Sequence, residues 1–103
     1  MIHALHHASL TTDDAEQLAS FYETLLGFQR VMATEWDGDN PTADAIFGLT
    51  DTSVRMVMLR AGATFLEIFE FRRPVEQRAA ADRKVSKPGF THIAVITDDI
   101  DAD

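Results

Sequence analysis

One segment of this sequence occurs twice, and that repeat constrains the fold more than any other feature. Residues 7–16 (HASLTTDDAE) align with residues 92–101 (HIAVITDDID), so that His, Thr and two Asp match in register. Internal repetition indicates a fold built from copies of one supersecondary unit. We therefore expect a complete first unit over residues 1–72 and the start of a second unit at 90–103.

Hydrophobic spacing predicts a β-α-β-β-β order in the first unit. Residues 14–26 place Leu18, Phe21, Leu25 and Leu26 at helical intervals, and these side chains are expected to pack on a sheet. Asp13 is expected to cap this helix, with Glu16 completing a capping box and Gly27 ending the helix. The strands are expected at 2–12, 28–33, 54–60 and 64–71, and residues 34–52 are expected to be a loop with a short helical turn near 43–47.

Residues 73–89 are expected to be a linker between the two units. This stretch is polar and rich in alanine, and it ends in Lys87-Pro88-Gly89. It also belongs to the most basic part of the chain, which holds six of the nine basic residues: Arg72, Arg73, Arg78, Arg83, Lys84 and Lys87. After it, residues 90–103 are expected to supply the first strand of the second unit. The fold class that follows is α+β.

Charge and composition exclude several classes of function. The 103 residues carry 17 acidic and 9 basic side chains, a net charge of −8, which disfavours nucleic acid and anionic membrane surfaces as partners. No apolar run approaches the roughly 20 residues of a membrane span, and no signal peptide is apparent, so the expected location is cytoplasmic. There is no cysteine, so any metal must be held by histidine and carboxylate, which suits Zn²⁺, Fe²⁺, Mn²⁺ or Ni²⁺.

Glu67 lies in an unusual place for a carboxylate. Side chains alternate across a strand, so Glu67 in TFLEIFEF shares one face with Phe65, Phe69 and Phe71. Removing a carboxylate from water is costly unless something compensates. A metal ion would compensate, as would a partly solvated face or a partner arginine.

His7 and His92 occupy the same place in the two copies of the repeat. A single histidine on a strand is more often a packed, hydrogen-bonded residue than a ligand. Its recurrence raises the case for a metal ligand, because neutral imidazole binds the metals named above. His3 and His6 have no counterpart in the second copy, which favours a structural or surface role for them.

Taken together, these motifs resemble the vicinal oxygen chelate superfamily, which includes glyoxalase I, methylmalonyl-CoA epimerase, extradiol dioxygenases and bleomycin-resistance proteins. The resemblance rests on His7, Asp13-Asp14, Phe21-Tyr22, Leu26-Gly27-Phe28, Leu66-Glu67 and His92. It implies two βαβββ modules around one divalent metal, with His7, Glu67 and His92 as ligands. The last ligand of the second module has no counterpart in these 103 residues.

The resemblance also implies a range of reactions on a small substrate that chelates the metal through oxygen. The leading expectation is a metal-dependent lyase or isomerase working through an enolate-type intermediate, with Glu67 as a candidate base. The alternatives are an extradiol-type dioxygenase, for which two histidines and a carboxylate are the usual iron ligands, and a binding protein without catalysis. Since one module leaves sheet edges exposed, a homodimer is expected.

Overall fold

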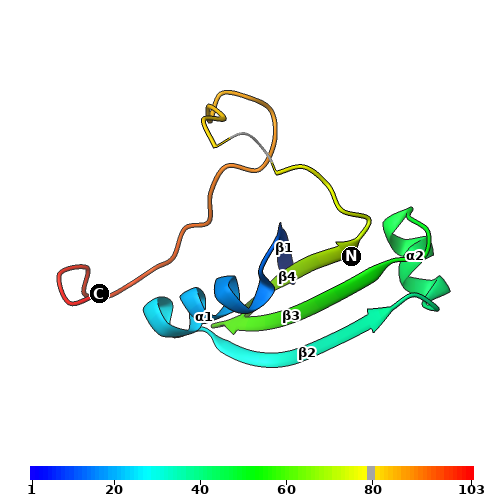
Figure 1. Cartoon of the computed structure of the whole chain (residues 1–103). Coiled ribbons are helices and arrows are strands. Elements are labelled where there is room, and N and C mark those ends of the chain that lie inside the picture. The colour runs from blue at the N-terminus through cyan, green and yellow to red at the C-terminus, as the bar shows by residue number, and fades with distance from the viewer. Residues whose placement is uncertain (79–80) are drawn as a thin grey trace.

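The chain folds into one four-stranded sheet with two helices, as the computed structural model shows (Figure 1). The structure describes residues 1–78 and 81–103. The elements follow in the order β1 (His7–Thr12), α1 (Ala15–Leu26), β2 (Gln29–Asp37), α2 (Pro41–Phe47), β3 (Ser53–Ala61) and β4 (Thr64–Arg73). The expected β-α-β-β-β order and the α+β class are confirmed, and the short helical turn is α2.

The strands lie in the order β1-β4-β3-β2, so the first and last strands of the module are neighbours. β1 runs parallel to β4, whereas β3 runs antiparallel to both β2 and β4. The tight connection from β3 to β4 contains Gly62 at φ +62°, a conformation that glycine adopts without steric cost. This topology places His7 and Glu67 on adjacent strands although 60 residues separate them in the chain.

Helix α1 covers one face of the sheet through its small residues. Ala15 and Ala19 are fully buried against Val57, Leu59, Leu66 and Ile68, with Leu18 and Tyr22 half-buried beside them. Alanine at the contact lets the helix backbone approach the sheet closely. The expectation that Phe21, Leu25 and Leu26 carry this contact is wrong, because their side chains project past the alanine stripe and stay 50%, 64% and 42% exposed.

The N-terminus of α1 is capped one residue later than expected. Asp14 is the N-cap, and its carboxylate accepts the Gln17 N–H at 2.9 Å. The Ala15 N–H, which has no partner within the helix, donates to Glu70 of β4 at 2.9 Å. Asp13 is left to pair with Arg78, and Gly27 ends the helix in the left-handed conformation as expected.

Two strand boundaries differ from the sequence expectation by more than two residues. β2 continues to Asp37 and so includes Thr34–Asp37, which the acidic composition had placed in a loop. β1 begins at His7 rather than at residue 2. In both places the neighbouring strand sets the boundary. β3 is long enough to pair with Trp36 and Asp37, whereas β4 pairs with β1 only from His7 onward.

Residues 74–103 leave the sheet as an extended trace that contains turns but neither helix nor strand in its described part (Figure 1). Residues 79–80 of the expected linker lie outside the described residues. The stretch 90–97, expected as a strand, is irregular here. A strand requires a neighbour to bond with, and the backbone hydrogen bonds described beyond residue 90 all lie between Asp99 and Asp103. No helix in the described part is long and apolar enough to cross a bilayer.

Candidate metal and substrate site

The face of the sheet opposite α1, called here the open face, carries the candidate site. Residues paired directly across neighbouring strands share a face, and the register pairs His7 with Phe65, Ser9 with Glu67, and Met58 with Glu67. The open face therefore presents side chains from all four strands: His7, Ser9 and Thr11; Phe65, Glu67, Phe69 and Phe71; Val54, Met56, Met58 and Arg60; and Gln29, Met32, Thr34 and Trp36.

His7 and Glu67 come together at the centre of this face. The His7 Nε2 atom lies 3.7 Å from Glu67 Oε1, with the two side chains 37% and 16% exposed. The same Oε1 accepts a hydrogen bond from the Ser9 hydroxyl at 2.7 Å. Within the described part of the chain, Glu67 Oε2 takes part in no hydrogen bond. Ser9 thus fixes the carboxylate oxygen that lies nearest to His7.

The geometry of this pair suits a divalent metal. Zinc lies about 2.0–2.2 Å from imidazole nitrogen and from carboxylate oxygen, so one ion can bridge two atoms 3.7 Å apart. Neutral imidazole with carboxylate is also the donor set that Zn²⁺, Fe²⁺ and Mn²⁺ accept. Among the described side chains of this face, Arg60 also carries a positive charge, and its guanidinium donates to Gln29.

His92 lies outside this pair. It belongs to the irregular stretch after the linker, where its Nδ1 atom is 2.9 Å from the Thr91 hydroxyl. Across residues 1–78 and 81–103, no group of three His, Asp or Glu side chains is arranged to hold a metal ion. The structure therefore brings together two of the three residues that the sequence pointed to, and the third stays a prediction.

An aromatic cluster borders the pair along β4, and sequence reasoning missed most of it. Phe47 of α2 packs edge-on against Phe69 and Phe71, with ring centroids 5.3 and 5.4 Å apart, and stacks on Trp36 at 6.3 Å. Trp36 falls in the stretch 34–52, which was expected to be a loop. It lies in β2, where its indole N–H donates to the buried Thr52 hydroxyl at 2.9 Å.

A network around Asp44 holds this aromatic cluster in place. Asp44 Oδ1 accepts hydrogen bonds from the Thr52 hydroxyl at 2.5 Å and from the Thr52 backbone N–H at 3.1 Å. Its other oxygen accepts the Asp51 N–H at 2.8 Å. Bonding to Thr52 keeps the pKa of Asp44 below its ordinary value. The carboxylate thereby ties α2, which carries Phe47, to the start of β3.

A cavity of about 600 Å³ adjoins the open face at the C-terminal ends of β1 and β4. Thr11, Phe71 and Leu49 line it from the sheet side, and residues 74–78 line it from the chain that leaves β4. Across it Arg78 pairs with Asp13, and this bond keeps the pKa of the Asp13 carboxyl below its ordinary value. A volume of this size accommodates a small organic molecule.

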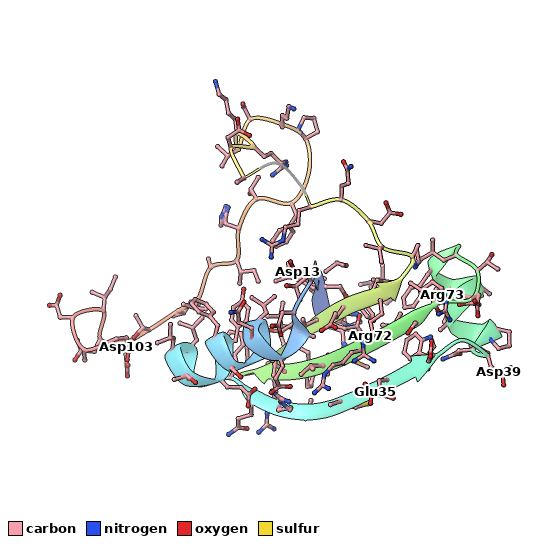
Figure 2. The ribbon with its side chains drawn as sticks, in the orientation of Figure 1. Asp13, Glu35, Asp39, Arg72, Arg73 and Asp103 are labelled. Atoms are coloured by element: carbon pink, nitrogen blue, oxygen red, sulfur yellow. The ribbon has the colours of Figure 1, made fainter. Side chains whose placement is uncertain are left out.

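The acidic residues on the other face of the sheet have structural partners. Glu16 and Glu23 bind Arg30, and the bond from Arg30 lowers the pKa of Glu16. Arg72 and Glu35 are labelled in Figure 2, and their closest atoms lie 3.1 Å apart. Arg72 Nε also lies 3.5 Å from Glu70 Oε1. Of the two carboxylates on β4, Glu67 and Glu70, only Glu67 therefore points to the open face.

Comparison with known proteins agrees with this architecture. The family model of the Glyoxalase/Bleomycin resistance protein/Dioxygenase superfamily matches residues 4–103. A curated relative, the 2-epi-5-epi-valiolone epimerase of Actinomyces sp, is 34% identical over an alignment of 102 residues that covers 96% of this chain and 54% of the relative. This chain thus spans about half the length of that relative.

Two solved structures share the fold. A glyoxalase family protein from Bacillus cereus superposes with a TM-score of 0.76 over 87% of this chain and 60% of its own, at 18% identity. The protein SMU.1112c superposes with a TM-score of 0.64 over 99% of this chain and 70% of its own, at 22% identity. With the family match over almost the whole sequence, the β1-β4-β3-β2 sheet and the His7–Glu67 pair on its open face, the chain belongs to the glyoxalase/bleomycin resistance protein/dioxygenase superfamily.

Proposed function

We propose that this protein is a divalent-metal-dependent isomerase, an epimerase that moves a proton at a carbon beside a carbonyl group of a small polyhydroxylated substrate. The pairing of His7 with Glu67 on the open face is the observation that carries the proposal. The epimerase relative, at 34% identity, supports this reaction over the dioxygenase and the non-catalytic binder.

His7 and Glu67 would hold the metal. When bound, it supplies Lewis-acid stabilisation for negative charge that develops on a substrate oxygen. Protein sites for catalytic zinc usually have three protein ligands, so further donors would have to come from elsewhere. Two sources fit the sheet. The stretch around His92 can add to the free edge of β1, or a second copy of the chain can bring its own His7 and Glu67.

Glu67 is the candidate for the proton transfer itself. The Ser9 hydroxyl holds Oε1, which leaves Oε2 able to take a proton from a substrate carbon and to return one. The Glu67 side chain is 16% exposed and shares its face of β4 with Phe65 and Phe69. The aromatic cluster of Trp36, Phe47, Phe69 and Phe71 gives an apolar wall against which the carbon ring of a cyclic substrate can lie.

Hydrogen exchange tests the proposal. The protein is loaded with Zn²⁺, Mn²⁺ or Ni²⁺ and incubated with 2-epi-5-epi-valiolone in D₂O, and NMR follows the carbons beside the carbonyl. We expect deuterium at one of these carbons together with a second diastereomer. Glu67→Gln should abolish both, whereas Glu23→Gln, which alters an ion pair on the other face, should change neither. Exchange at the wild-type rate in Glu67→Gln, or none in the folded, metal-loaded wild type, would overturn the proposal.

A further inference from the structure

His6 lies immediately before β1 and is fixed by two contacts with β4. Its carbonyl oxygen accepts the Phe65 N–H at 3.0 Å. Its ring stacks on the Phe65 ring, with centroids 4.8 Å apart and planes 21° from parallel. Because Phe65 belongs to the open face, these contacts bring the His6 ring to the same side of the sheet as His7.

The two histidine rings meet through one nitrogen each. His6 Nδ1 lies 2.8 Å from His7 Nδ1, and the rings stand almost perpendicular at 86°. A nitrogen pair at this distance is a hydrogen bond, so one Nδ1 carries a hydrogen and the other offers a lone pair. With Nδ1 of His7 occupied, Nε2 is the ring nitrogen that faces Glu67, at 3.7 Å.

We propose that His6 is a positioning residue for His7: it holds the His7 ring so that Nε2 is presented to Glu67, and it accepts the Nδ1 hydrogen that an Nε2-ligating imidazole carries. This inference rests on the proposed function in one respect, that His7 is a metal ligand. The partner of the non-ligating nitrogen is what fixes the tautomer and orientation of a ligating histidine. Here a second histidine fills that place.

Two substitutions separate positioning from simple packing. His6→Phe keeps an aromatic ring to stack on Phe65 and removes the nitrogen. His6→Asn loses the stacking but keeps a polar side-chain atom near the place of Nδ1. His3→Phe is the matched control, since His3 is an exposed histidine three residues earlier. A packing role predicts that Phe is tolerated and Asn is not, whereas a positioning role predicts the reverse.

The first readout is ¹⁵N NMR of the histidine ring nitrogens in the metal-free protein. We expect the His7 Nδ1 signal to move in His6→Phe and to stay close to its wild-type position in His3→Phe. The second readout is calorimetric titration with Zn²⁺ alone. His6→Phe should weaken binding about fivefold, the fold-change that corresponds to a net hydrogen bond of about 1 kcal/mol, and His6→Asn should weaken it less.

An unchanged His7 Nδ1 signal in His6→Phe would overturn the proposal whatever the Zn²⁺ result. Equal or greater loss of Zn²⁺ affinity in His6→Asn would also overturn it, because packing would then explain the effect. If the wild type bound no Zn²⁺ at all, the proposed function would fail, and the spectra of the metal-free protein would still decide the role of His6.

Discussion

Replacing Glu67 by Gln should reduce the stability that the fold gains from metal binding. In the metal-free protein the change is expected to be small, within about 1 kcal/mol, because the amide oxygen can still accept the Ser9 hydroxyl and no buried cation loses its partner. With Zn²⁺ at 100 times its dissociation constant, the wild type should gain about 2.7 kcal/mol. For a domain of this size that corresponds to a rise in Tm of about 10–20 °C.

The variant should lose much of this gain. Removing even a hydrogen-bond partner of a metal ligand typically weakens metal binding at least about tenfold. If the amide in Glu67→Gln binds Zn²⁺ about tenfold more weakly than the carboxylate, the same Zn²⁺ concentration stabilises the variant by only about 1.4 kcal/mol. Thermal unfolding followed by circular dichroism, with Zn²⁺ and with EDTA, measures both values, and Glu23→Gln serves as the control. A Zn²⁺-dependent rise in Tm that is equal in wild type and Glu67→Gln would refute the assignment of Glu67 as a ligand.

Three further predictions test the fold and the assembly. Ala19→Leu should destabilise the protein by about 1–3 kcal/mol in urea unfolding, because Ala19 is fully buried between α1 and the sheet, whereas Leu at the exposed Ser20 should cost little; similar costs at both sites would contradict the packing. The ordinary pKa of an aspartate is 3.8, and the pKa of Asp44 lies below it, so the Asp44 carboxylate stabilises the fold until the pH falls below 3.8. The fluorescence of Trp36, the single tryptophan, should therefore stay constant as the pH falls to 3.8 and change only below it. Asp44→Asn should lack this step, and a step centred above pH 3.8 would be inconsistent with the Asp44–Thr52 bond. Sedimentation should show a dimer at micromolar concentration, since β1 and β2 leave free sheet edges within the described residues; a folded monomer would count against it.

The sequence predicted the elements of the module better than their contacts. Helical spacing located α1, and strand alternation placed Glu67 correctly among phenylalanines on one face. Periodicity alone could not show that Ala15 and Ala19, rather than Phe21 and Leu25, make the closest contact with the sheet. Which apolar residues are buried depends on how near the helix approaches, and small residues decide that.

The candidate site was also predictable only in part. The repeat and the alternation pointed to His7 and Glu67, and the parallel pairing of β1 with β4 brings them together. The contact between His6 and His7 could not be predicted, because alternation along a strand would direct their side chains to opposite faces. β1 begins only at His7, so His6 does not follow that alternation and can turn toward its neighbour. Phe47 was equally hidden, since nothing in its sequence neighbourhood indicates that α2 folds back on β4.

The position of the metal tests the account most directly. A crystal of the protein grown with Zn²⁺, measured at the zinc absorption edge, locates the ion by its anomalous signal. We predict a peak on the open face, about 2.0–2.2 Å from both His7 Nε2 and a carboxylate oxygen of Glu67. A zinc peak held by other side chains, with neither His7 nor Glu67 among its ligands, would contradict it.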